Sequence, residues 1–132
     1  MRKEVEFLKE RGKEFWERGF EDFQKKRYNL CVLDFEQAIQ LWLKYLIALK
    51  TGDFPKTHYI SELIEIVGEI YNTKKLKNFY KKNLLSIKEI EDAYIVSRYY
   101  PRKFTKEEAE AVIKISLKIV KILENEGKVK FI

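Results

Sequence analysis

An all-α fold is the structure that this sequence predicts: an up-and-down antiparallel bundle of about five helices, in one domain spanning residues 1–132. Apolar residues recur every three or four positions, which is the period of one helix face. The 132 residues include only 5 glycines and 2 prolines, which favours long regular elements over the dense turns of a β-sandwich. The length is that of a single ordinary domain.

The first two helices are predicted from long apolar runs. Over residues 2–26, charged positions separate apolar ones at helical spacing, namely Val5, Leu8, Phe15, Trp16, Phe20 and Phe23. The run over residues 28–50 is apolar around more of its circumference, which is typical of a helix at the centre of a bundle. Gly52 and Pro55 are expected to end it, because glycine adopts the positive φ of a helix end and proline prevents continuation.

Two or three further helical segments are expected in the middle of the chain. A helix over residues 58–71 can take its N-cap from Thr57. The lysine-rich segment 74–83 is expected to continue as a short helix. Ser86 and Glu89 have the spacing of a capping box, in which each side chain bonds the backbone N–H of the other, so another helix is expected to start there.

The last helix is predicted from a second capping box. Pro101 ends the preceding element, and Thr105 with Glu108 has the pattern that opens a new helix. Gly127 is expected to close this helix and to leave residues 128–132 as a tail. Helices joined by such short connections pack as antiparallel neighbours.

The composition points to a protein of the cytoplasm. A single cysteine, Cys31, excludes an internal disulfide framework and suggests a buried thiol in a reducing compartment. No run approaches the ~20 uninterrupted apolar residues that cross a bilayer. The first ten residues also lack the apolar block of a secretion signal. We therefore expect a cytoplasmic location and no membrane partner.

The aromatic content predicts self-association. The chain has 9 Phe, 8 Tyr and 2 Trp, and in so short a chain some large apolar surface is expected to stay uncovered in the monomer. A symmetric homodimer is the expected way to cover that surface.

The positive charge is modest in total and uneven in placement. The formal net charge is +6, from 27 Lys and Arg against 21 Asp and Glu. Six lysines and no acid lie between positions 74 and 88, and Lys114, Lys118 and Lys121 lie on one face of the last predicted helix. Two interpretations stay open for these lysines: a solvated face, or a surface for nucleic acid or an acidic partner.

The motifs of conventional enzymes are absent. The single histidine, His58, excludes a metal site built from several imidazoles. The sequence contains no G-x-S-x-G elbow, no P-loop and no G-x-G-x-x-G. We therefore expect no catalytic residues of these kinds, no metal site and no cofactor.

Thr57 and His58 form the first candidate site. They lie at the predicted start of a helix, where free backbone N–H groups attract anions, so a phosphate could bind there. In the alternative interpretation, Thr57 only caps the helix, and His58 packs beside it with a hydrogen bond to a carbonyl.

The second candidate site is the segment 92–103, which interleaves cations with aromatic rings. Arg98, Arg102 and Lys103 could bind phosphate while Tyr99 stacks on a base. In the alternative interpretation, Arg98 pairs with an acid inside the bundle and the tyrosines fill the core. The sequence leaves both interpretations open.

These residues give the chain a resemblance to the HEPN family, the "higher eukaryotes and prokaryotes nucleotide-binding" domains. The resemblance covers about residues 23–123. It rests on Gln37-Ala38 followed by Lys44, on Gly52 and Pro55 before Thr57-His58 and Leu63, on Tyr94-Ile95 with Ser97-Arg98-Tyr99 and Pro101, and on Glu108-Ala109. It implies a five-helix up-and-down bundle, usually dimeric and often made beside a small nucleotidyltransferase with which it pairs. We add Lys44 to the candidate nucleotide-binding residues.

Two departures from the family pattern shape the functional hypothesis. Gln40 stands where members commonly carry an acid, and it can hydrogen-bond but brings no charge. HEPN ribonucleases carry a His four to six residues after an Arg, and no His follows Arg98. We therefore expect a non-catalytic module that binds a nucleotide or polyphosphate and pairs with a nucleotidyltransferase, as in toxin–antitoxin or stress-response pairs. The alternatives are a metal-independent ribonuclease using Arg98 and His58, and an interaction-only helical dimer.

Overall fold

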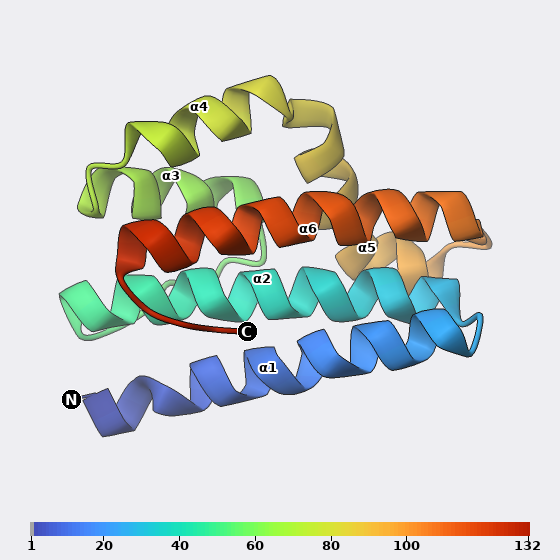
Figure 1. The fold of residues 1–132 in the computed structure, drawn as a ribbon, viewed down its shortest axis with the longest axis horizontal. Coiled ribbons are helices and arrows are strands. Elements are labelled where there is room, and N and C mark those ends of the chain that lie inside the picture. Colours follow the sequence, from blue (N-terminus) through green and yellow to red (C-terminus); the bar gives the residue numbers. More distant parts are fainter. Residues whose placement is uncertain (1) are drawn as a thin grey trace.

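Six helices account for most of residues 2–132, the range that the computed structural model describes (Figure 1). This range contains no β-strand, which confirms the all-α prediction. The helices are α1 Arg2–Gln24, α2 Tyr28–Thr51, α3 Ile60–Ile70, α4 Lys74–Lys82, α5 Leu84–Tyr99 and α6 Lys106–Gly127. The count exceeds the expected five because the lysine-rich segment and the helix after it are separate elements.

Helix α2 is the centre of the bundle, as its all-round apolar sequence predicts. It contacts α1, α3, α5 and α6, and Figure 1 shows α1 and α6 lying along its two sides. Phe35 and Trp42 of α2 are among its largest fully buried side chains. Cys31 is buried on the same helix, as predicted. Every other long helix is therefore positioned against α2.

Close packing of α1 on α2 depends on a small residue facing a large one. A Cβ atom added at Gly12 of α1 would overlap the indole ring of Trp42. The Trp42 indole N–H also donates a 3.0 Å hydrogen bond to the carbonyl of Lys9. The α1 backbone thus lies directly on the Trp42 ring.

The helix ends confirm some of the sequence predictions. Gly52 has φ 88° and donates its N–H to the carbonyl of Ala48 at the end of α2. Thr105 and Glu108 form the predicted capping box at the start of α6. Both ends are defined by local hydrogen bonding, which is why the sequence alone identifies them.

Two other predicted helix signals are wrong. Helix α5 begins at Leu84, so Ser86 and Glu89 lie inside it and form no capping box. Helix α6 ends at Gly127, but the left-handed residue that closes it is Lys128, with φ 53°. A Cβ atom at Gly127 would collide with the side chain of Leu46, so close packing on α2 explains this glycine.

Residues 128–132 form no helix, yet they pack against the bundle. The ring of Phe131 is buried and stacks on Trp42, with centroids 4.7 Å apart and planes inclined by 16°. The backbone N–H groups of Phe131 and Ile132 donate to the carboxylate of Glu124 at 2.6 and 3.0 Å. The segment expected as a tail therefore contributes a ring to the core.

Candidate functional site

A polar stripe crosses the otherwise apolar helix α2. Glu36, Gln40 and Lys44 are spaced four residues apart, which places them on one face of the helix, and all three are buried. Polar groups in such a position need hydrogen-bond partners to offset the loss of water. The partners that they find define the candidate site.

Glu36 is the most deeply buried member of the stripe. Its two carboxylate oxygens accept hydrogen bonds from the side-chain amides of Gln37 and Gln40, each at 2.7 Å. Burial raises the pKa of the Glu36 carboxyl to about 7, although the two amides and the positive charges of Arg98 and Lys44 act in the opposite direction. The carboxyl therefore titrates near neutral pH.

Lys44 lies inside the bundle. Its exposed fraction is 7%, and burial lowers the pKa of its ammonium group, while the negative charge of Glu36 partly opposes this shift. Its Nζ atom lies 5.9 Å from the centroid of the Phe54 ring. The structure thus makes Lys44 part of the polar interior next to Glu36, and sets it apart from the exposed cations of the second candidate segment.

Gln40 links this polar interior to His58. Its amide nitrogen donates to Glu36, so its amide oxygen faces the imidazole, where His58 Nδ1 donates a long hydrogen bond at 3.4 Å. An amide oxygen can only accept, which places the proton of the neutral ring on Nδ1. The other ring nitrogen, Nε2, is then the one that carries a free lone pair.

His58 and Arg98 both lie against Tyr94. The imidazole stacks on the Tyr94 ring, with centroids 4.5 Å apart and planes inclined by 17°. The Arg98 guanidinium lies 4.6 Å from the centroid of the same ring and 5.0 Å from that of Tyr99. The fold therefore brings together the two residues that the sequence singled out, with Tyr94 in contact with both.

Arg98 keeps its charge available. Its Nε donates to the carbonyl of Tyr94 at 3.0 Å, and its Nη2 donates to the same oxygen. Within residues 2–132 no carboxylate forms an ion pair with it, and its side chain is exposed. The interpretation in which Arg98 pairs with a buried acid is therefore wrong.

An aromatic hollow of about 570 Å³ adjoins His58 and Tyr94. Tyr59 and Tyr100 also line it, and both are exposed. Tyr99 follows Arg98 in the chain and is 70% exposed. The rings that line the hollow can contact a base, and the guanidinium of Arg98, which lies against the Tyr94 ring but does not line the hollow, can contact a phosphate.

The predicted anion site at the start of the third helix is already occupied. Helix α3 begins at Ile60, and Thr57 does not cap it, because the Thr57 hydroxyl accepts only the N–H of Tyr59, at 3.2 Å. Glu91 of α5 instead accepts the backbone N–H and the hydroxyl of Ser61, at 2.8 and 2.6 Å. A carboxylate of the protein thus holds the place expected for a phosphate, and the prediction that Thr57 caps this helix is wrong.

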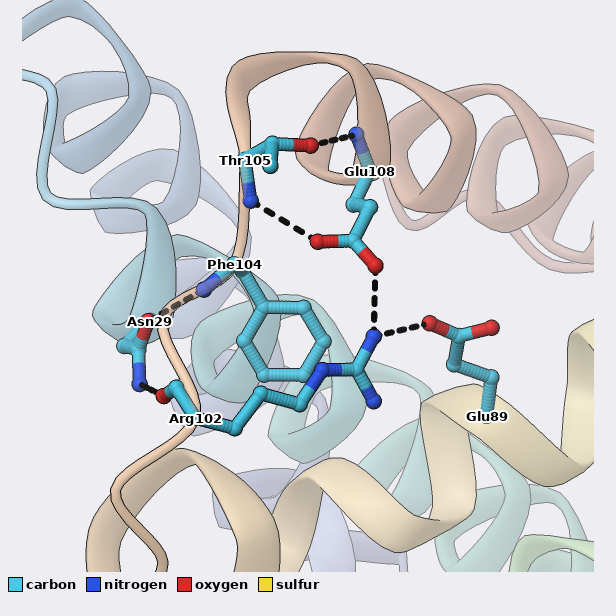
Figure 2. Close-up of polar contacts among 6 residues, drawn as sticks. All are labelled: Asn29, Glu89, Arg102, Phe104, Thr105 and Glu108. Carbon is cyan, nitrogen blue, oxygen red and sulfur yellow. Dashed lines mark hydrogen bonds and ion pairs between the residues drawn. The ribbon is translucent and has the colours of Figure 1, made fainter.

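Arg102 links helices α5 and α6 through ion pairs (Figure 2). Its Nη2 donates to Glu89 of α5 at 2.8 Å and to Glu108 of α6 at 2.6 Å. Two carboxylates surround this one guanidinium, so it carries no excess charge for a phosphate. Lys103 is exposed and forms no ion pair within the described range.

Asn29 of α2 fixes the segment that carries these cations. Its side-chain amide donates to the carbonyl of Ser97 at 3.1 Å. The same amide donates to the carbonyl of Arg102, and the side-chain oxygen accepts the N–H of Phe104, each at 2.9 Å (Figure 2). The chain between α5 and α6 is therefore held against the central helix. This attachment sets the direction in which α5 presents Tyr94 and Arg98.

Glu36 belongs to the site but was not predicted from the sequence, although one sequence pattern points to it. Glu36, Gln40 and Lys44 repeat at four-residue spacing along a helix that is apolar elsewhere. Such a stripe indicates a buried polar network. Tyr59 and Tyr100 carried no comparable signal, since an isolated surface tyrosine is common.

The chain matches a known protein family. The sequence model of the HEPN domain matches residues 5–126. No curated protein and no solved structure matches the chain. In residues 2–132, no group of His, Cys, Asp and Glu side chains could hold a metal ion, and no helix is long and apolar enough to cross a membrane.

Proposed function

Because the chain belongs to the HEPN domain family, we propose that it is a non-catalytic module that binds a nucleotide or polyphosphate through Arg98. Membership in the family supports a nucleotide-binding or ribonuclease-type module in general. The observation that carries the specific proposal is the contact of both His58 and Arg98 with the ring of Tyr94.

Each group at this site has a distinct part in binding. The exposed guanidinium of Arg98 forms charge-assisted hydrogen bonds with phosphate oxygens. Tyr99 and the exposed rings at the hollow offer faces on which a base stacks. In the neutral ring, Nε2 of His58 can accept a hydrogen bond from a hydroxyl or amino group of the nucleotide, and only a protonated ring offers an Nε2–H donor to phosphate. Arg102 has no part, because Glu89 and Glu108 neutralise its charge, and Thr57 is left out because it does not cap α3.

Isothermal titration calorimetry with ATP and with GTP tests this proposal. Arg98→Ala is expected to weaken binding tenfold or more, since a hydrogen bond to a charged group contributes about 1.5–3 kcal/mol. Arg11→Ala is the matched control, because Arg11 is an exposed arginine of α1 lying over the Phe7 ring. Heats no larger than those of buffer dilution for both nucleotides would reject the proposal. Equal weakening in both variants would reject the role of Arg98.

A metal-independent ribonuclease is the second candidate, and the neighbourhood of His58 and Arg98 favours it. An imidazole with a free Nε2 can accept the proton of a ribose 2′-OH as this oxygen attacks the adjacent phosphorus. Arg98 would stabilise the negative charge that develops on the phosphate. A second imidazole, from another copy of the chain, would protonate the leaving oxygen.

Incubation of a mixed RNA pool with the protein in the presence of a chelator tests this second role. In this second role the wild type cleaves the RNA, and His58→Ala purified in the same way does not. Intact RNA with the wild type would reject the ribonuclease role, and equal cleavage by both proteins would assign the activity to a contaminant.

Pairing with a small nucleotidyltransferase and formation of a homodimer complete the proposal. Several large apolar side chains are exposed, and Leu85, at the start of α5, is 86% exposed. Such side chains favour association. Sedimentation velocity measures the mass of the protein alone, and a monomer at all concentrations would reject the homodimer.

A further inference from the structure

A second hollow lies between α4 and α6, outside the site described above. Its volume is about 670 Å³, and none of its lining residues lines the hollow beside His58. It brings together the two lysine-rich surfaces for which the sequence analysis kept two interpretations, a solvated face or a binding surface. The lysine-rich segment supplies one wall, and the stripe on the last helix supplies the other.

The charge of this hollow is entirely positive. Four exposed lysines line it, and no Asp or Glu does: Lys75 and Lys82 from α4, Lys118 and Lys121 from α6. None of the four forms an ion pair with a carboxylate of residues 2–132. Lys75 and Lys82 lie two turns apart on one face of α4, a separation of about 10 Å along the helix. Positive charges in such a row suit a ligand with repeated negative charges.

The rest of the lining is apolar or amide. Phe79 of α4 and Ile122 of α6 supply apolar surface, and three asparagines supply amide donors and acceptors. A ligand that matches all three features carries repeated negative charge, flat apolar rings and hydrogen-bonding edges. An acidic peptide provides the charge without the rings, and a duplex keeps its base faces stacked inside.

We infer that this hollow, named here the lysine hollow, binds single-stranded nucleic acid. The four lysines contact consecutive phosphates, the bases lie against Phe79 and Ile122, and the amides meet the base edges. This function is separate from nucleotide binding at Arg98, with which the hollow shares no residue. Either site can therefore be lost without the other.

Fluorescence anisotropy with labelled oligouridine and oligothymidine, over a series of salt concentrations, tests the inference. A hollow variant combines Lys75→Gln, Lys82→Gln, Lys118→Gln and Lys121→Gln. A charge-matched control changes four exposed lysines elsewhere: Lys13→Gln, Lys25→Gln, Lys26→Gln and Lys130→Gln. Circular dichroism verifies that both variants are folded. If the hollow variant is not, the pair Lys118→Gln and Lys121→Gln replaces it against a matched pair of control substitutions.

The expected result is selective loss. The hollow variant binds either oligonucleotide at least tenfold more weakly than the wild type, while the control variant loses less than threefold. The slope of log affinity against log salt also falls by roughly 3 in the hollow variant, since each phosphate contact on a single strand contributes about 0.7. ATP binding by the hollow variant stays at the wild-type level, which separates this test from that of the Arg98 site.

Three results would overturn the inference. The first is that the wild type binds neither oligonucleotide. The second is that the hollow and control variants lose affinity for the oligonucleotides equally. The third is that oligoglutamate displaces the bound oligonucleotide as effectively as unlabelled oligouridine does. The last result would assign the lysine hollow to an acidic protein segment.

Discussion

The imidazole ring of His58 stacks on the phenol ring of Tyr94, with centroids 4.5 Å apart and planes inclined by 17°. His58 lies in the connection before α3, whereas Tyr94 is on α5. Arg98 follows Tyr94 by one helical turn and covers the same ring. Tyr94 is thus the shared contact of the one imidazole in the chain and an unpaired guanidinium.

Replacing the Tyr94 ring is expected to weaken nucleotide binding. Tyr94→Ala removes the ring against which His58 and Arg98 lie, so both side chains lose their fixed positions in the free protein. Calorimetry should then show weaker binding of ATP, by up to the roughly tenfold loss expected when the Arg98 hydrogen bond itself is removed. Tyr94→Phe keeps the ring and should bind within about twofold of the wild type. Equal loss in both variants, with unchanged thermal unfolding, would contradict a role of the ring.

The buried carboxyl of Glu36 is expected to make stability depend on pH. Its pKa is about 7 in the folded protein and ordinarily 4.5, so between these values the folded state binds more protons than the unfolded chain. The free energy of unfolding therefore falls as pH rises through this range. Glu36→Gln removes the effect, and its stability relative to the wild type should rise by roughly 3 kcal/mol from pH 4.5 to pH 8.

Urea unfolding at several pH values measures this difference. Asp34 of α2 also has its pKa raised to about 7, by burial and by the neighbouring carboxyl of Asp22, against the opposing effect of Arg18. It titrates over the same range, so only the difference between the Glu36→Gln variant and the wild type isolates Glu36. Parallel stability curves for these two proteins would contradict the assignment.

Glycine at position 12 is expected to be required for packing. In Gly12→Ala the new methyl group overlaps the Trp42 indole, and such overpacking costs about 1–3 kcal/mol. Gly68→Ala in α3 is the matched control. There the new Cβ lies 3.0 Å from Cγ of Lys77, an exposed side chain that can move, and alanine favours a helix over glycine by about 0.5–1 kcal/mol.

Thermal unfolding compares these two glycine variants. The transition midpoint of Gly12→Ala should fall, while that of Gly68→Ala should stay or rise. A fall of equal size in both would indicate that a general effect of adding a methyl group to a helix, and not contact with Trp42, controls the stability of the variants.

The fold was predictable where its signals are local. The rhythm of apolar residues defines the long helices, and the capping box of Thr105 with Glu108 is complete within four residues. The prediction at Ser86 failed because Asn83 alone separates α4 from α5, so the helix is already formed before Ser86. The role of Gly127 also escaped prediction, since it depends on Leu46 of another helix.

The candidate site was predictable in its residue types and not in its contacts. His58 and Arg98 were both identified, but their common contact with Tyr94 is a tertiary arrangement. The charge of Arg102 is neutralised by acids from two different helices. Glu91 fills the start of α3 from α5. Each of these facts depends on how helices distant in sequence pack together, which no local pattern encodes.

The proton NMR signal of the His58 ring tests the central claim most directly, since the chain has a single histidine and its Cε1–H resonance needs no assignment among others. Addition of ATP should shift this resonance in the wild type, and at an ATP concentration that half-saturates the wild type the shift should be several times smaller in Arg98→Ala. A resonance that stays in place in the wild type at saturating ATP, or that shifts equally in Arg98→Ala, would contradict a common site of His58, Tyr94 and Arg98.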